Sequence, residues 1–306
     1  MLYGLDIGGT KIELAAFHNN HQILTRRVAT PTHCYHAFKS TIQTLVFETD
    51  TELKTRGTVG IGLPGIIDPI SLKSYCANIP CANNQNLIAD LEFVLDRPVR
   101  IENDANCFIL SESHGGSAAG FNTALGIILG TGCGGGLYIN GKLHKGRNNT
   151  AGEWGHVPLP YNIYDIGGKD FPIIECGCGR KGCLDSYLSA RGLELLHQHY
   201  FDTQLTAKDI INTYQQQNNE AIKTVHVYCE LLACSLASLV NTMDPDIVVV
   251  GGGLSNFDNL YQLLPDLLDK YTLPLNRLPE IRKAIYGDSS GVRGAALLNA
   301  YEQYQP

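Results

Sequence analysis

The sequence predicts an α/β protein made of two like halves, and three observations lead to that prediction. The chain has 306 residues, a length that usually accommodates about two domains. Apolar, β-branched runs alternate with segments of helical periodicity along the chain. A strand, a glycine-rich turn and a second strand occur at residues 2–17 and again at residues 123–139. We expect the two halves to face each other across a cleft and to grip one polyphosphate from both sides.

The composition argues against several classes of partner. The net charge of −7 and the lack of a Lys/Arg cluster argue against binding to nucleic acid. No basic segment followed by an apolar one opens the chain, so no secretory signal is expected. No apolar run approaches the roughly 20 residues that span a bilayer, so no membrane partner is expected either. The ten cysteines are therefore expected to be reduced in a cytoplasmic protein.

The elements of the first half follow from apolar periodicity and from the glycines and prolines that interrupt it. Residues 2–5 and 12–17 are expected to be the strands on either side of the first glycine turn. The other expected elements are a strand at 22–29, a helix at 35–53, a buried strand at 58–63, a helix at 87–95, a strand at 99–101, and a helix that opens within 102–106 and runs to about 112. Residues 114–117 are the expected linker.

The second half repeats the opening pattern and adds a mostly helical region. Its expected elements are a strand at 123–129, a glycine turn at 130–136, a strand at 137–139, helices at 184–199, 207–214 and 221–243, a strand at 246–250, a strand near 283–286 and a helix from about 291. Ligands of open α/β sheets lie at strand ends such as the glycine-rich segment 251–256. We expect domains at 1–116 and 117–290, with the helix at about 291–306 packing back on the first.

The first glycine turn has the chemistry of a phosphate-binding loop. Glycine lacks Cβ, so a phosphate can approach the N–H groups of Gly8 and Gly9. Thr10 adds a hydroxyl donor and Lys11 a positive charge, while Asp6 could hold Mg²⁺ through water. A Gly-Gly dipeptide alone is typical of an ordinary hairpin. The full string is more specific, although it matches neither a Walker A loop nor a dinucleotide fingerprint.

Asp104 is the predicted general base. It follows a strand and opens a helix, a junction from which side chains project toward a ligand. The alternative is that Asn103 or Asp104 only caps the helix, which is common for both residue types. Two phosphate-type turns favour catalysis, because an alcohol that attacks a phosphate needs a carboxylate to take its proton.

A cysteine cluster predicts a structural zinc site. Cys176, Cys178 and Cys183 lie within eight positions, and their glycine-rich spacing lets the backbone wrap an ion. His156 is the nearest good candidate for a fourth ligand. A filled Cys₃His site leaves no open position, so its expected role is to hold a loop near the substrate. The alternative is a chance cluster of small residues.

Several polar loop residues would suit a polyol ligand, whose hydroxyls need paired donors and acceptors once they are desolvated. They are Asn78, Glu153, His156 and Asp185. Each alone would be interpreted as a surface or capping residue.

Five motifs, in this order, resemble those of the ROK family of bacterial sugar kinases and repressors. They are Asp6-Ile7-Gly8-Gly9-Thr10-Lys11, Glu102-Asn103-Asp104-Ala105-Asn106, Gly130-Thr131-Gly132, Gly152-Glu153-Trp154-Gly155-His156 and the cysteine motif at 176–183. The resemblance covers essentially the whole chain. It is greatest to family members that phosphorylate N-acetyl-D-glucosamine, with supporting strings at 170–172 and 251–257.

The resemblance implies an actin-like ATPase fold, in which two ribonuclease-H-like α/β domains flank a hinged cleft. It also implies ATP with Mg²⁺, held by both glycine turns with the purine near the third glycine-rich segment. The implied ATP-binding residues are Gly4, Asp6, Gly8, Gly9, Thr10, Lys11, Gly130, Thr131, Gly132, Cys133, Gly134, Gly135, Gly136, Leu137, Gly252 and Gly253.

The implied reaction is phosphorylation of the sugar 6-hydroxyl in amino-sugar salvage, with Asp104 as the base. The implied sugar-binding residues are Asn78, Asn103, Asp104, Glu153, His156 and Asp185, and the implied zinc ligands are His156, Cys176, Cys178 and Cys183. A homodimer is implied by the resemblance alone.

One position departs from the family pattern. The family usually has Glu two residues after the last zinc cysteine, in contact with the sugar, and this chain has Asp185. The shorter side chain leaves open other hexose substrates, those of N-acetylmannosamine kinase, glucokinase or fructokinase. A sugar-sensing repressor is a rival from another class, but the phosphate-loop strand begins at Leu2, so no DNA-binding domain is expected before it. A sugar-binding protein without activity is a third possibility.

Overall fold

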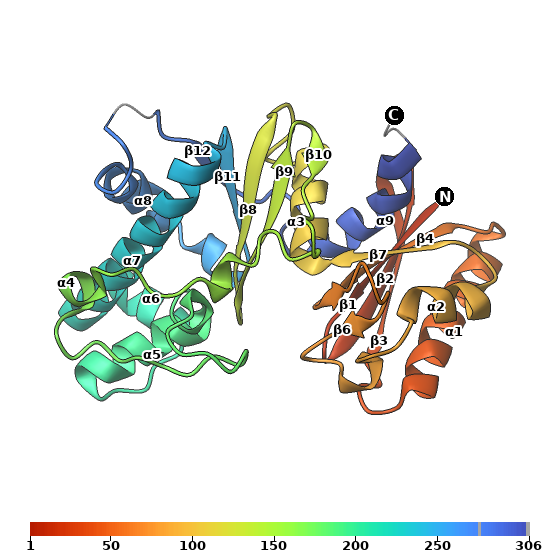
Figure 1. The fold of residues 1–306 in the computed structure, drawn as a ribbon, viewed down its shortest axis with the longest axis horizontal. Coiled ribbons are helices and arrows are strands. Elements are labelled where there is room, and N and C mark those ends of the chain that lie inside the picture. Colours follow the sequence, from red (N-terminus) through yellow and green to blue (C-terminus); the bar gives the residue numbers. More distant parts are fainter. Residues whose placement is uncertain (275–276, 304–306) are drawn as a thin grey trace. The chain divides into compact units, whose positions relative to one another are not determined.

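The computed structural model describes residues 1–274 and 277–303, which form two compact units (Figure 1). Unit 1 contains Met1–Gly116, Leu143–Ala151 and the described chain from Asp288 onward. Unit 2 contains Ser117–Lys142 and the described part of Gly152–Gly287. Residues 143–151 thus belong to unit 1, although they lie within the predicted second domain, 117–290.

Unit 1 is built on a five-stranded sheet of order β3-β2-β1-β4-β7. Its strands are β1 (Leu2–Ile7), β2 (Lys11–His18), β3 (His21–Ala29), β4 (Thr58–Leu63) and β7 (Val99–Asn103). The first three strands pair antiparallel, whereas β4 lies parallel to β1 and to β7. The carboxyl ends of β1, β4 and β7 therefore share one edge, which carries the first glycine turn and Asn103. A two-stranded sheet of β5 (Ile66–Ile67) and β6 (Ser74–Tyr75) follows β4.

The sheet of unit 2 repeats this order as β10-β9-β8-β11-β12. Its strands are β8 (Thr123–Leu129), β9 (Cys133–Ile139), β10 (Lys142–Leu143), β11 (Ile247–Gly251) and β12 (Glu280–Lys283). Strand β8 pairs antiparallel with β9 and parallel with β11, as β1 does with β2 and β4. The repeated strand–turn–strand pattern in the sequence therefore corresponds to a repeated sheet.

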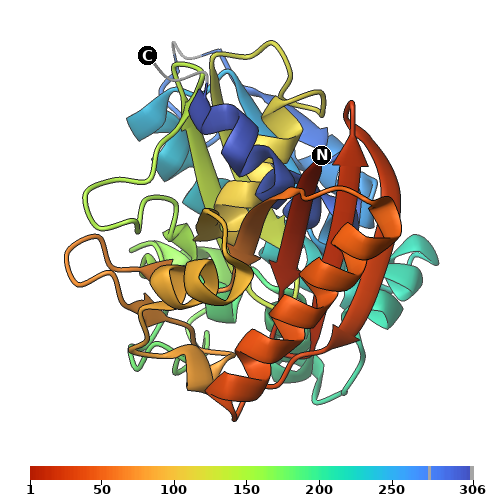
Figure 2. The ribbon, with the colours of Figure 1, turned by 90° about the vertical axis from the view of Figure 1, so that its right-hand side faces the viewer.

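Helices cover both faces of the unit 1 sheet. They are α1 (Tyr35–Leu53), α2 (Leu87–Leu95), α3 (Asp104–Ser113) and α9 (Ser290–Gln303). Leu14 and Ala16 join the core cluster of α1 and α2, whereas the alternate residues Ala15 and Phe17 pack with Val292 of α9. This alternation follows from the two-residue period of a strand. Figure 2 shows α1 running along the sheet of this unit.

Helix α9 approaches the sheet over glycines. A Cβ built on Gly60 of β4 would lie 1.9 Å from the Ala295 carbonyl oxygen. A Cβ on Gly4, which pairs with Gly60 in register, would lie 1.9 Å from the Val292 carbonyl oxygen. These two positions therefore require glycine so that α9 can pack on β1 and β4.

Unit 2 holds a long helical insertion between β10 and β11. Its helices are α4 (Ile163–Gly167), α5 (Ala190–Phe201), α6 (Ala207–Gln215) and α7 (Asn219–Met243), and α8 (Asn259–Asp269) follows β11. Helix α7 is long and apolar enough to cross a membrane by length and composition, with a mean hydropathy of 1.3 over an 18-residue window. However, 67% of that window is buried inside the structure, as in the core helix of a globular protein.

The structure confirms α1 and α2 with the predicted bounds and corrects several others. The predicted helix at 184–199 begins only at Ala190, because the Ser189 side chain caps it by accepting the Gly192 N–H. The last strand is Glu280–Lys283 rather than 283–286. Helix α8 has no counterpart in the sequence prediction, and Pro265 lies inside it.

Candidate functional site

The first glycine turn joins β1 to β2 and is held from outside by Thr30. The Gly8 N–H donates to the Lys11 carbonyl oxygen at 2.9 Å and closes the turn. The Thr30 hydroxyl donates to the Gly8 carbonyl oxygen at 2.7 Å, and the Thr30 N–H donates to the Thr10 carbonyl oxygen at 3.1 Å. Thr10 is exposed and the Lys11 side chain is 55% exposed, so their donors can reach a ligand.

Asp6 is a largely desolvated carboxylate beside this turn. Burial, reinforced by the nearby charge of Glu13 and opposed by Lys11, raises the pKa of Asp6 to about 6. A Cβ built on Gly291 would lie 3.1 Å from Asp6 Oδ2, so the start of α9 packs closely against the carboxylate. A divalent cation would favour the ionised form that burial disfavours.

Gly4, one of the predicted nucleotide-binding residues, has a packing role in the structure. It lies within β1, is buried, and faces the backbone of α9. The contact with α9 accounts for glycine at this position, and a nucleotide-binding role for Gly4 stays a prediction.

Asp104 and Asn103 lie where β7 ends and α3 begins, at the same sheet edge as the first turn. Asn103 is the N-cap, and its Oδ1 accepts the Ala105 N–H at 2.9 Å. Asp104 Oδ1 accepts the same N–H at 2.8 Å, so the helix start orients the carboxylate. The amide of Asn103 also donates to the Gly65 carbonyl oxygen at 3.3 Å, which ties the turn after β4 to this site.

Asn78 lies beside the first turn. A Cβ built on Gly9 would lie 3.0 Å from both Cβ and the carbonyl oxygen of Asn78, so Gly9 allows the two loops to touch. Asn78 itself is exposed. Unit 1 thus gathers Asp6, the glycine turn, Asn78, Asn103 and Asp104 around one edge of its sheet.

The second glycine turn, in unit 2, is shorter than predicted. Only residues 130–132 connect β8 to β9, because Leu129 pairs directly with Cys133. The start of α5 holds this turn: the Ala190 N–H donates to the Gly130 carbonyl oxygen at 2.8 Å, and Arg191 Nε donates to the Thr131 carbonyl oxygen at 3.0 Å. Gly252 lies beside it with φ of 80°, and a Cβ there would lie 2.5 Å from the Leu129 carbonyl oxygen. A Cβ on Gly253 would meet nothing within 4 Å.

Residues 133–137, predicted to line the second phosphate site, belong to strand β9. Their glycines admit a neighbouring loop: a Cβ on Gly135 would lie 2.6 Å from the Trp154 ring. Trp154 Nε1 also donates to the Gly134 carbonyl oxygen at 2.8 Å. Contacts with Trp154 therefore account for Gly134 and Gly135, and only residues 130–132 of the predicted segment lie in the turn itself.

Asp185 connects the cysteine loop to the second turn. Its Oδ1 accepts the Cys133 N–H at 2.7 Å, and a Cβ on Gly132 would lie 2.9 Å from the same oxygen. One oxygen of the shortened side chain is thus engaged within unit 2 at the start of β9. The sequence, which predicts that Asp185 binds the sugar, does not reveal this contact, because Cys133 lies 52 residues away.

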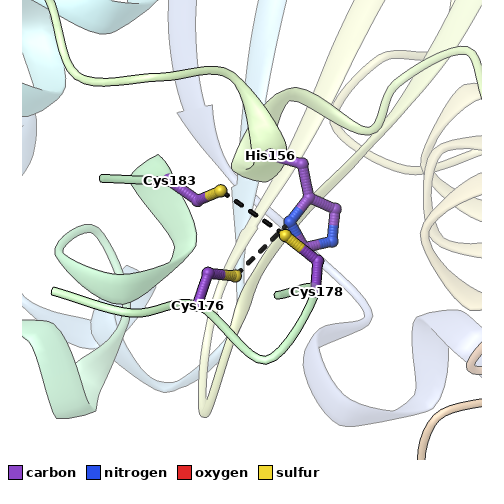
Figure 3. A group of neighbouring side chains, drawn as sticks. All are labelled: His156, Cys176, Cys178 and Cys183. Carbon is purple, nitrogen blue, oxygen red and sulfur yellow. Dashed lines mark hydrogen bonds between the residues drawn. The ribbon is translucent and has the colours of Figure 1, made fainter. Parts of the chain in front are cut away.

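His156, Cys176, Cys178 and Cys183 form a cluster that fits a tetrahedral metal ion. Their ligand atoms all lie within 4.8 Å of one another, and Figure 3 shows the four side chains converging. Cys176 Sγ lies 3.7 Å from His156 Nδ1, and Cys178 Sγ lies 3.6 Å from Cys183 Sγ. Hydrogen bonds from Arg180 lower the pKa of Cys178 to about 6, which favours the thiolate that a metal needs. Three sulfurs and one imidazole are the donor set of structural zinc.

His156 presents its second nitrogen to Glu153. Nε2 lies 3.8 Å from Glu153 Oε2, while Nδ1 faces the cysteines. Burial raises the pKa of Glu153, the charge of His156 opposes this and Asp185 adds to it. The metal cluster, Glu153 and Asp185 therefore lie within one connected part of unit 2.

Sequence reasoning missed the residues that hold these loops. Thr30 and Arg191 donate to the backbone of the two glycine turns, and Trp154 donates to the backbone of β9. Trp154 gave a signal, because it is the only tryptophan of the chain and lies inside the motif 152–156. Thr30 and Arg191 gave none, since their partners are far along the sequence.

Comparison with known proteins identifies relatives along the whole chain. The model of the ROK family matches residues 2–302. The chain is 46% identical to the N-acetyl-D-glucosamine kinase of Yersinia pseudotuberculosis serotype O:1b (strain IP 31758), over 99% of this chain and 100% of that protein. It is also 46% identical to the protein of the same name from Vibrio cholerae serotype O1, over 98% and 99% of the two chains.

Solved structures agree with this relationship. The ROK hexokinase from Thermus thermophilus matches with a TM-score of 0.85 and 30% identity, over 97% of this chain and 96% of that chain. A ROK family glucokinase from Streptomyces griseus, solved in complex with glucose and AMPPNP, matches with a TM-score of 0.79 and 26% identity, over 97% and 98%. Two α/β units with the same sheet order are the actin-like ATPase architecture of these kinases. The chain therefore belongs to the ROK family.

Proposed function

We propose that this protein is an ATP-dependent sugar kinase that phosphorylates the 6-hydroxyl of N-acetyl-D-glucosamine. The observation that carries the proposal is 46% identity to N-acetyl-D-glucosamine kinases over nearly the whole of both chains. The intact Asp104 at the start of α3 supports a catalytic member of the family over a sensor. The products are N-acetyl-D-glucosamine 6-phosphate and ADP.

In the proposed mechanism, Asp104 acts as the general base. It takes the proton of the 6-hydroxyl as that oxygen bonds to the γ-phosphorus, and the bond from phosphorus to the leaving ADP oxygen breaks. The helix N-terminus favours the ionised carboxylate that accepts the proton. Asn103 and Asn78 supply amides for the sugar hydroxyls on the same unit.

ATP is proposed to use the open donors of both glycine turns. The Gly8 N–H already donates to the Lys11 carbonyl oxygen and the Gly130 N–H to the Gly132 carbonyl oxygen, so neither is counted. The proposed donors are the Gly9 N–H with Thr10 and Lys11 in unit 1, and the N–H groups of Thr131 and Gly132 in unit 2. Asp6 suits Mg²⁺, which would neutralise phosphate charge when bound with ATP. Gly253, where a Cβ would meet nothing, leaves space for the purine. The proposal requires the donors of the first and second glycine turns to bind the same ATP molecule. A crystal structure with a bound ATP analogue tests this requirement.

Zinc is proposed at His156, Cys176, Cys178 and Cys183, where the donor set fits the ion. A bound zinc would supply rigidity rather than reaction chemistry, because four protein ligands complete its coordination. It would hold His156 so that Nε2 and Glu153 can meet sugar hydroxyls. Glu153 and Nε2 already lie close together, which supports a shared ligand.

An ADP-coupled assay across a sugar panel tests this function. We expect the highest kcat/KM with N-acetyl-D-glucosamine, compared with N-acetylmannosamine, glucose and fructose, and a 6-phosphate in the product by NMR. A higher kcat/KM for another sugar would assign that substrate instead. ADP formation with none of them would indicate a sugar-binding protein without kinase activity.

A further inference from the structure

A strap of nine residues, Leu143–Ala151, belongs to unit 1, although the residues on both sides of it belong to unit 2. It closes on itself through the Ala151 N–H, which donates to the Lys145 carbonyl oxygen at 3.1 Å. Two side chains anchor it in unit 1. Asn149 Nδ2 donates to the Ile67 carbonyl oxygen at 2.9 Å, and Lys145 Nζ lies 2.8 Å from Glu102 Oε2.

Glu102 links this strap to the catalytic turn. Its side chain is only 6% exposed, and its two oxygens have different partners. Oε2 faces Lys145, while Oε1 accepts the Asn103 N–H at 2.8 Å and Asn106 Nδ2 at 3.0 Å. The carboxylate therefore holds the last residue of β7 and the first turn of α3, on either side of Asp104.

We propose that Glu102 and Lys145 are positioning residues for phosphoryl transfer, with Lys145 holding the buried Glu102 charge in the orientation that sets the direction of Asp104. This inference rests on the proposed function, since it gives Asp104 the role of base. A misplacement of about 1 Å at a reacting group can cost about 100-fold in rate. Without Lys145, the buried Glu102 carboxylate would turn toward water, and this change would release the Asn103 N–H.

The strap also leads directly into the loop that carries Glu153, a proposed sugar-binding residue. Ala151 is followed directly by Gly152 and Glu153. The ion pair thus anchors, within unit 1, the segment that leads into the Glu153 loop. A cavity of about 240 Å³ lies beside the pair, lined by Gly65, Ile67, Leu72, Asn103, Lys145 and Asn149 among others.

The test compares Lys145→Met, Glu102→Gln and the double variant with a control, Lys142→Met. Lys142 lies three residues before Lys145, is exposed, and has no ion pair among the residues that the structure describes. We expect each single variant to lower kcat at least 10-fold, with both KM values within threefold and the control unchanged. Gln in place of Glu102 needs no cation, so the double variant should be no slower than the slower single variant.

A second measurement does not depend on activity. Amide hydrogen exchange of the peptide covering residues 103–107 should become faster in Lys145→Met and stay unchanged in Lys142→Met. Unchanged exchange, kcat within twofold of the unaltered chain, or losses that multiply in the double variant would each overturn the inference. A loss of rate that matches a loss of folded protein would also overturn the inference, because Glu102 and Lys145 would then have only a structural role.

These outcomes are distinct from failure of the proposed function. If the unaltered chain phosphorylates no sugar in the panel, the kinase assignment fails, and the exchange measurement alone decides whether Lys145 holds the turn at Asp104.

Discussion

At the start of helix α3, one backbone amide meets two side-chain oxygens. The Ala105 N–H donates to Asn103 Oδ1 at 2.9 Å and to Asp104 Oδ1 at 2.8 Å. Asn103 is the N-cap of α3, so Asn103 rather than Asp104 has the capping role that the sequence allowed for either residue. A helix that already has a cap allows its first residue to serve a ligand.

Asp104→Asn tests the base directly. We expect kcat to fall by about 10²–10⁴-fold, the usual contribution of general base catalysis, while the fold is kept because Asn is also tolerated at helix starts. The control is Asp209→Asn, a change of the same type in the first turn of α6. Steady-state kinetics with thermal melts measures both. Turnover within a few-fold of the unaltered chain would remove Asp104 from the role.

Asp6 shows the conflict between stability and ligand binding. Its pKa is raised to about 6 in the folded chain, from an ordinary value of 3.8. The folded state therefore binds the proton more tightly than the unfolded state. Proton binding to Asp6 therefore stabilises the folded state. This stabilisation is fully present below pH 3.8 and is lost as the pH rises through about 6.

Asp6→Asn should therefore stabilise the ligand-free protein at high pH. We expect a gain of roughly 3 kcal/mol in the free energy of unfolding at pH 8 and about half of that at pH 5. The variant should bind Mg²⁺–ATP more weakly, because an amide is a poorer ligand for Mg²⁺. Urea unfolding at the two pH values measures the gain, and an equal effect at both would contradict the ionisation argument.

At the scale of elements, the cysteine-containing segment 176–183 connects several loops of unit 2. Cys176 and Arg180 are joined by a backbone hydrogen bond of 2.7 Å, and the Leu184 N–H donates to the Val157 carbonyl oxygen at 3.0 Å. The same loop delivers Asp185 to the start of β9. Metal binding there should stabilise the second phosphate turn as well as the Glu153 loop.

Removal of the metal tests this connection. Purified protein should contain one zinc per chain, and Cys183→Ser should lose it, lower the melting temperature and raise the KM for sugar more than 10-fold. The matched control is Cys34→Ser, which changes an exposed cysteine of unit 1 outside the cluster. Elemental analysis and kinetics measure the effects. Protein that is fully active without zinc would contradict the assigned role.

At the scale of the whole molecule, unit 1 is assembled from both ends of the sequence. Helix α9 packs on β1 and β4 from more than 220 residues along the chain. Gly4 and Gly60 allow this approach, and on α9 a Cβ built on Gly294 would lie 1.8 Å from the Cys107 carbonyl oxygen of α3. Unit 1 can therefore complete its core only after α9 is available.

Gly60→Ala should weaken this packing. The added methyl would meet the Ala295 carbonyl oxygen, and we expect a loss of about 3 kcal/mol in the free energy of unfolding. In the ligand-free protein, Gly253→Ala is the control, because a Cβ there would meet nothing within 4 Å. Urea unfolding followed by circular dichroism measures the loss, and equal midpoints for the two variants would contradict the packing argument. Trp154 fluorescence reports on unit 2 separately, since the only tryptophan lies there.

The sequence by itself determined what depends on neighbours along the chain. Apolar periodicity located α1 and α2 with the bounds found, and the spacing of Cys176, Cys178 and Cys183 with His156 predicted a cluster that does converge. The repeated strand–turn–strand pattern predicted the duplicated sheet. Such signals are local because secondary structure and chelating loops are set by short-range periodicity and spacing.

Only the tertiary structure decided which partner each residue meets. Gly4 allows α9 to pack closely, and Gly135 does the same for the Trp154 ring. Asp185 accepts the Cys133 N–H, and Lys145 forms an ion pair with Glu102. Each of these partners lies far along the chain. A glycine is equally suited to a phosphate or to a packed helix, and a carboxylate to a sugar or to an amide. The residue type limits the possible chemistry, and the packing of distant segments selects one use of it.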